Sequence, residues 1–155
     1  MRRPLSILTA LALLPGALSA QLRTTHVPNA DAVRKAIQAA EAEAHRNGWN
    51  VSIAVVDAAG ELLGFLRLDG APPSSVAVSQ AKARSAARFR RPTQAMDSAL
   101  AAGRSAFLVL PDAMPVAGGV PIVVNGEFVG AVGVSGATAA QDAQVAAAGA
   151  AVVVP

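Results

Sequence analysis

The pair Asn125-Gly126 constrains the fold more than any other feature of the chain. It separates two runs rich in β-branched and apolar residues, Val120–Val124 and Glu127–Val134. An Asn-Gly pair in this setting favours a type I′ turn, because both central residues of that turn need positive φ. We therefore predict a β-hairpin that ends in the glycines around Ser135.

Helical and strand patterns before and after the hairpin predict the rest of the order. Asn29 can cap a helix that ends near Gly48, and Thr138 with Gln141 can form a capping box for a C-terminal helix. The other elements are expected as strands at 51–56, 61–68 and 106–110, a basic helix from Ser74 or Ser75 to about Arg90, and a short helix at 94–101. These hairpins predict a five-stranded antiparallel sheet flanked by helices, an α/β (α+β) fold in the order α-β-β-α-α-β-β-β-α.

The first twenty residues have the pattern of a secretory signal peptide. Arg2 and Arg3 precede an apolar run of 14 residues, Leu5 to Leu18, and small residues follow it. A membrane-spanning helix needs about 20 apolar residues, so this run is too short to be one. We expect residues 1–20 to be removed and the mature protein to be periplasmic or extracellular, with no membrane span.

The mature chain is then expected to hold a flexible N-terminal segment, residues 21–28, and a single domain over residues 29–155. Its net charge is +1, because 11 of the 13 Lys and Arg residues remain against 10 Asp and Glu. This balance, with 3% aromatic residues, predicts no nucleic-acid binding. The absence of Cys and the presence of only two His exclude a thiolate site or a multi-histidine metal centre within one chain.

No group of residues in the sequence predicts catalysis. Ser135 lies in a Gly-Val-Ser-Gly-Ala segment that lacks the final glycine and the parallel sheet of a hydrolase nucleophile turn. Asp57, Asp69 and Asp142 fall at turns or at a helix start, where capping explains a carboxylate. We therefore predict no catalytic residues.

The basic helix is a candidate anion site. Its cations are Lys82, Arg84, Arg88 and Arg91, together with Arg90. The spacing i, i+4, i+7 places Arg84, Arg88 and Arg91 on one helix face, and no acidic residue lies between Ala71 and Gln94. Two interpretations stay open: a solvated helix face, or a site where guanidinium groups bind the carboxylates of a tetrapyrrole or a small organic acid.

His45 is the leading candidate for a metal ligand. It lies near the end of the first predicted helix, where the helix dipole stabilises a surface histidine. The alternative role is that of an axial ligand to haem iron. His26, in the N-terminal segment, is the second candidate.

Three segments and one dipeptide of the chain resemble a known family. They are VSIAVVDAAGELLGFLRLDGAP, AKARSAARFRRPT, MPVAGGVPIVVNGEFVGAVGVSG and the later Gln141-Asp142. Together they are similar to the GlcG/HbpS-like haem-binding family, which includes the C-terminal domain of PduO proteins. The resemblance covers about residues 30–153 and implies a profilin-like fold, a homo-oligomer and, for several members, haem as the cofactor.

With this resemblance we expect an exported protein that binds haem or another tetrapyrrole, in haem or iron handling or redox-stress sensing. His45 would bind the iron, and Lys82, Arg84, Arg88 and Arg91 would hold the propionates. An exported or membrane sensor protein is a further expected partner. Two alternatives stay open: an accessory enzyme that acts on a small carboxylate or degrades haem, and a ligand-free interaction module.

Overall fold

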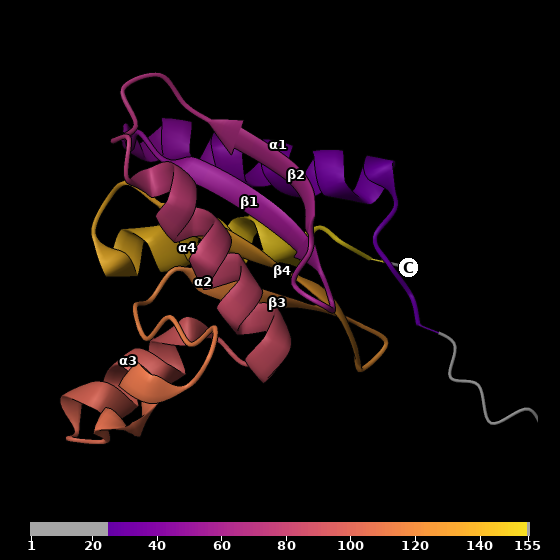
Figure 1. Ribbon diagram of the computed structural model, residues 1–155. Helices are drawn as coiled ribbons and strands as arrows, with labels where there is room; N and C mark the ends of the chain where they lie inside the picture. The colour runs from indigo at the N-terminus through magenta and orange to yellow at the C-terminus, as the bar shows by residue number, and fades with distance from the viewer. Residues whose placement is uncertain (1–24, 155) are drawn as a thin grey trace, which may run out of the picture.

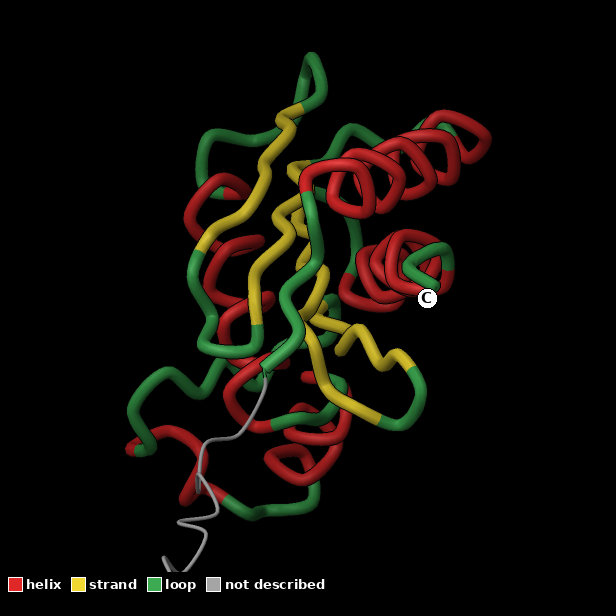
Figure 2. Tube along the Cα trace, turned by 90° about the vertical axis from the view of Figure 1, so that its right-hand side faces the viewer, coloured by secondary structure: helices red, strands yellow, loops and turns green. Residues whose placement is uncertain are grey.

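The computed structural model describes residues 25–154, which form a three-layer domain around one antiparallel sheet (Figure 1). The strands are β1 (Ser52–Asp57), β2 (Leu62–Arg67), β3 (Gly119–Val124) and β4 (Glu127–Ser135), in the order β2-β1-β4-β3. The helices are α1 (Ala30–Asn47), α2 (Ser75–Phe89), α3 (Thr93–Ala101) and α4 (Ala139–Ala151), with a 3₁₀ helix, η1 (Ser105–Val109). Helices α1 and α4 cover one face of the sheet and α2 covers the other (Figure 2).

The predicted signal peptide and residues 21–24 of the N-terminal segment lie outside the described residues. Residues 25–29 have no regular secondary structure and lead into α1. Among the helices of residues 25–154, none is long and apolar enough to cross a membrane.

The local signals in the sequence are confirmed at the hairpin and the helix ends. Asn125 and Gly126 have φ of 51° and 80°, as a type I′ turn requires. Asn29 caps α1 by accepting a hydrogen bond from the backbone N–H of Ala32. Thr138 and Gln141 form the expected capping box at α4. Each of these signals acts within four residues, so the sequence alone is sufficient to specify it.

The fifth strand, expected at residues 106–110, was a wrong prediction. These residues belong to η1 and its end, and the sheet of the described residues has four strands. In a short apolar run, the spacing of apolar residues does not distinguish a strand from a short helical turn. Here Phe107 packs inward, whereas Leu108 and Val109 are exposed, and the 3₁₀ turn forms local backbone hydrogen bonds that a strand would form with a neighbour.

The two faces of the sheet have different side chains. Valine and isoleucine fill the layer under α1 and α4, with Ile53 and Val55 of β1 as examples. The layer under α2 is built from small residues, including Ala54 and Ala131. At Gly133 of β4, a Cβ would lie 2.1 Å from the carbonyl oxygen of Ser79, so α2 touches the strand backbone. Small side chains therefore permit an unusually close contact between helix and sheet.

Gly133→Ala should destabilise the domain by about 3 kcal/mol, because the added methyl would meet helix backbone that cannot move aside. Gly48→Ala is the matched control, since a Cβ there meets nothing within 4 Å. That change should cost about 1 kcal/mol, the strain of placing alanine at φ of 69°. Urea unfolding measures both. Equal stability of Gly133→Ala and the wild type would contradict the close contact.

Candidate functional site

The sequence pattern predicts that the cations of α2 bind a ligand, but three of them, Lys82, Arg84 and Arg88, contact other groups of the chain. The Lys82 ammonium lies 2.8 Å from the Asp142 carboxylate, and only 2% and 3% of these two side chains are exposed. Asp142 belongs to the first turn of α4, on the other side of the sheet. Lys82 therefore links the two outer layers and is not presented to a ligand in solution.

The buried pair is enclosed by backbone. A Cβ on Gly118 would lie 2.7 Å from the carbonyl oxygen of Val134 and 2.8 Å from Lys82 Nζ, so a larger residue would collide with backbone beside the pair. Asp142 Oδ1 also accepts a hydrogen bond from the N–H of Ala137 at 3.0 Å. Burial raises the pKa of Asp142, and the hydrogen bonds from Lys82 and the backbone oppose that rise. The geometry is that of a structural ion pair.

Arg84 and Arg88 hold the turn between β1 and β2. Arg84 Nε donates to the carbonyl of Gly60 at 3.3 Å, and Arg88 Nε donates to the carbonyl of Ala59 at 2.8 Å. Arg88 also pairs with Glu61 and Asp112. The segment around the helix has no acidic residue, as the sequence indicated, but remote turns supply the carboxylates. Several of the hydrogen-bond donors of these two guanidinium groups are thus engaged by other groups of the chain.

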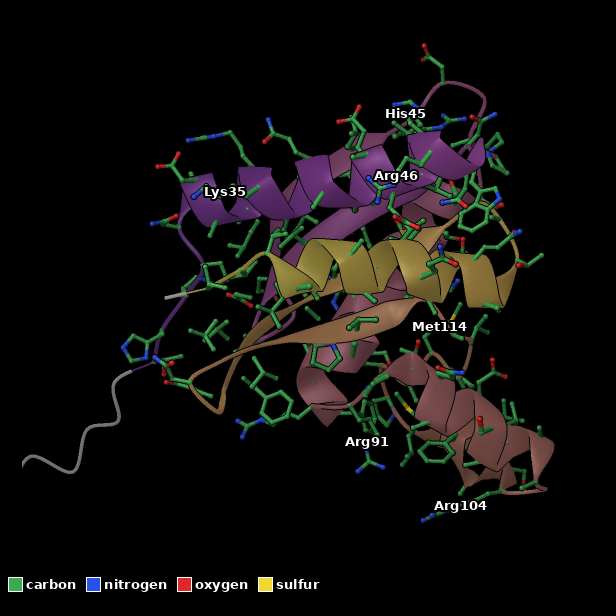
Figure 3. The ribbon with its side chains drawn as sticks, turned by 180° about the vertical axis from the view of Figure 1, so that it is seen from behind. Lys35, His45, Arg46, Arg91, Arg104 and Met114 are labelled. Carbon is green, nitrogen blue, oxygen red and sulfur yellow. The ribbon has the colours of Figure 1, made fainter. Side chains whose placement is uncertain are left out.

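The other two predicted site residues, His45 and Arg91, are exposed and lie apart from each other. Helix α2 ends at Phe89, with Arg90 in a left-handed cap, so Arg91 has left the helix face predicted for it. His45 projects from α1 on the opposite side of the sheet (Figure 3). Within the described chain, His45 and the α2 cations therefore do not line one common cavity.

His45 borders a separate cavity. Its volume is about 420 Å³, and it is lined by Glu41, His45, Asn50, Leu66, Arg67, Leu68 and Asp69. His45 Nε2 lies 3.6 Å from Glu41 Oε1, one helical turn before it. Arg67 donates to the carbonyl of Ala71 at 2.7 Å. The lining is mostly polar, with two leucines as its apolar part.

A more apolar cleft lies where the N-terminal segment, the β3–β4 hairpin and the C-terminal end meet. We call it the valine cleft; its volume is about 400 Å³. It is lined by His26, Val27, Pro28, Asn29, Ala32, Val124, Asn125, Glu127, Val129, Val153 and Val154. All five of its valines lie outside helices, and this run of valines near the chain ends and the hairpin is the sequence signal that could have pointed to the cleft.

His26 lies at this cleft in contact with a carboxylate. Its Nδ1 is 2.8 Å from Glu127 Oε2, across 101 positions of sequence. When Nδ1 carries the proton that this carboxylate accepts, Nε2 is left as a neutral nitrogen that can bind a metal. The sequence could not predict this arrangement, because the hairpin and the N-terminal segment meet only in the folded chain.

Arg90 lies in a neighbouring cavity on the other side of the hairpin. The cavity measures about 470 Å³ and is lined by Thr25, Ala58, Arg90, Asn125, Gly126, Glu127 and Phe128. The guanidinium carbon lies 6.0 Å from the centre of the Phe128 ring, at the limit of a cation–π contact. Asn125 and Glu127 line both this cavity and the valine cleft.

The order of elements and the two helical layers define an α+β fold, built in the described residues on a four-stranded antiparallel sheet. Residues 29–151 match the family described as "Haem degrading protein HbpS-like", and the chain belongs to this family. Protein GlcG of Escherichia coli strain K12 is 46% identical over 99 residues, which is 64% of this chain and 74% of GlcG. The expected GlcG/HbpS-like membership is confirmed.

Solved structures agree with this membership. The crystal structure of a double mutant of HbpS from Streptomyces reticuli has a TM-score of 0.79 and 36% identity, and the match covers 92% of this chain and 97% of that one. A crystal structure of a complex of PduOC with haem has a TM-score of 0.74 at 21% identity, covering 81% of this chain and 94% of that one. At that identity, the second likeness shows the fold alone.

Lys82→Met should destabilise the domain by about 3–5 kcal/mol, because it leaves a buried carboxylate without its cation. Burial would then raise the pKa of Asp142 further, because the hydrogen bond and the positive charge of Lys82 no longer lower it. A carboxyl whose pKa is higher in the folded state stabilises it at low pH, and this contribution is lost as pH rises. The variant should therefore lose stability from about pH 4 upward, as measured by urea unfolding across pH.

Arg34→Ala is the control for that experiment, since the Arg34–Asp31 pair has side chains 65% and 73% exposed. Its unfolding midpoint should stay close to that of the wild type. The double variant Lys82→Met/Asp142→Asn should recover part of the loss. Additive losses in the two single variants would contradict a coupled pair.

Proposed function

We propose that this chain is an exported haem-binding protein that holds the macrocycle in the valine cleft. The observation that carries the proposal is the contact between His26 and Glu127 at the rim of an apolar cleft. Apolar walls favour the faces of a tetrapyrrole, and an oriented imidazole supplies an iron ligand. Membership of a family described as haem-degrading supports the same ligand.

The size of the valine cleft supports a bound haem that is only partly enclosed by the chain. A volume of about 400 Å³ lies in the lower range of small-molecule sites. A planar guest there would leave an edge outside the chain, where solvent or a second subunit can meet it. We propose a homo-oligomer for this reason, and an exported or membrane sensor protein as a further partner in haem or iron handling or redox-stress sensing.

His45 remains the competing candidate for the iron ligand. It borders its own cavity, and two leucines there offer an apolar surface. Arg91 is exposed and can reach an anion, whereas binding of a propionate by Lys82, Arg84 or Arg88 would require those residues to give up contacts within the chain. We favour His26, because its carboxylate lies at hydrogen-bond distance and that of His45 lies 3.6 Å away.

Breakdown of bound haem is a second candidate function, favoured by the family description. It predicts that the absorbance of bound haem declines with time once a reductant and oxygen are supplied. A stable spectrum under those conditions would leave binding as the activity of the chain.

Titration of residues 21–155 with haemin should shift the Soret band at micromolar haem. His26→Ala should weaken binding by about tenfold or more, the loss of an axial ligand, whereas His45→Ala should bind like the wild type. Each variant is the control for the other, because both remove one exposed histidine.

The reverse pattern would assign the iron to His45 and contradict the valine cleft. Unchanged binding in both variants would show that neither histidine binds the iron. No Soret shift in the wild type would overturn the proposed function.

A further inference from the structure

Arg90, at the end of α2, has a guanidinium group without an acidic partner in the described chain. The residue is exposed, and none of the ion pairs or side-chain hydrogen bonds within residues 25–154 involves its guanidinium group. Its contact is with the Phe128 ring, whose centre lies 6.0 Å from the guanidinium carbon. Lys82, Arg84 and Arg88, by contrast, are engaged by other groups of the chain. Arg90 therefore retains the donors with which a guanidinium group binds a carboxylate.

The backbone of Arg90 has a conformation that arginine rarely adopts. Its φ and ψ are 51° and 42°, in the left-handed region, and its N–H donates to the carbonyl of Ala87 at 3.3 Å. Glycine is the usual residue at such a helix end, because it has no Cβ to collide with the backbone. The other non-glycine residues with positive φ in residues 25–154 are Asp112 and Asn125, whose residue types tolerate this region. Strained residues cluster at binding sites, so the strain at Arg90 directs attention to its side chain.

The cavity that Arg90 lines adjoins the valine cleft, since Asn125 and Glu127 line both. Arg90 and Glu127 are the charged residues in the lining of the Arg90 cavity, and Glu127 Oε2 lies 2.8 Å from His26 Nδ1. The negative group of this cavity is thus paired with the histidine, whereas the positive group is available to a ligand. Among the described residues that line the valine cleft there is no lysine or arginine. A carboxylate on a guest in that cleft would therefore find its cation in the adjoining cavity.

We propose that Arg90 binds a carboxylate of the guest in the valine cleft and so selects a tetrapyrrole with acidic side chains. This inference rests on the function proposed above. An edge of the macrocycle that extends out of the cleft past Asn125 and Gly126 brings its carboxylate to the guanidinium group, which binds it through two parallel hydrogen bonds. Phe128 lies against the guanidinium group, whose N–H donors point outward in its own plane and stay available.

The group that Arg90 recognises is then the carboxylate and not the iron. A tetrapyrrole without a metal should depend on Arg90 as haem does, because it carries the same acidic side chains. A tetrapyrrole whose carboxylates are esterified should not depend on Arg90, because a neutral ester forms no charge-assisted pair with a guanidinium group. These two guests separate the contribution of Arg90 from that of the iron ligand.

Fluorescence titration with metal-free protoporphyrin IX tests the proposal. Arg90→Gln should weaken its binding to residues 21–155 by about tenfold, through the loss of a charge-assisted pair. The dimethyl ester should bind the wild type about tenfold more weakly than the free acid does, and Arg90→Gln should weaken it no further. Arg104→Gln is the matched control and should bind like the wild type. Arg104 is also exposed and lies 5.5 Å from the centre of the Phe107 ring, but it lines none of the three cavities described above.

Arg90→Gly separates binding from folding. Glycine relieves the strain of the positive φ, so this variant should unfold at a urea concentration no lower than that of the wild type. Its affinity for protoporphyrin should nevertheless fall as in Arg90→Gln. Weaker binding by a variant that is no less stable identifies the guanidinium group, and not the fold, as the cause.

Equal affinity of the wild type and Arg90→Gln for protoporphyrin would overturn the proposal, and so would an equal loss in Arg104→Gln. A wild type that binds the free acid and the ester alike, or binds neither, would also overturn it. The iron ligand of the proposed function is tested by a different measurement, the effect of His26→Ala on haemin. A loss there, with no loss of protoporphyrin binding in Arg90→Gln, would contradict the carboxylate site alone.

Discussion

The close contact of α2 with the backbone of β4 determines how the rest of the domain is arranged. Gly133 and the alanines around it let the helix lie against the strand, at a distance that a single methyl group would prevent. This contact carries Lys82 inward to Asp142 and brings Arg84 and Arg88 over the β1–β2 turn. Helix α2, which the sequence shows to be basic, therefore connects the two outer layers through its ion pair with α4.

Helix α2 covers one face of the sheet, and α1 with α4 covers the other (Figure 2). The cavities described above therefore lie at the edges of these layers. The valine cleft forms where the N-terminal segment, the β3–β4 hairpin and the C-terminal end meet. The cleft combines apolar walls with His26, whose Nδ1 lies 2.8 Å from the Glu127 carboxylate.

Local sequence signals predicted the fold well wherever neighbouring residues decide the structure. The Asn125-Gly126 turn, the Asn29 cap and the Thr138–Gln141 capping box are all formed by residues within four positions of each other. The prediction was wrong at residues 106–110, where the same apolar run is compatible with a strand or a short helical turn. The candidate site was predictable only as a list of cations and histidines. Their partners, Asp142 for Lys82 and Glu127 for His26, lie 60 and 101 positions away.

The sequence by itself determined the antiparallel architecture, the helix ends, the family and the absence of cysteine chemistry, because turn geometry, capping and composition depend on residue type and short spacing. Only the tertiary structure decided which charges are free and which are buried. It also decided that His26 meets a carboxylate beside an apolar cleft and that the residues around Val109 remain outside the core. The physical reason is that burial and pairing depend on contacts between distant segments, and these contacts exist only after the helices have packed on the sheet.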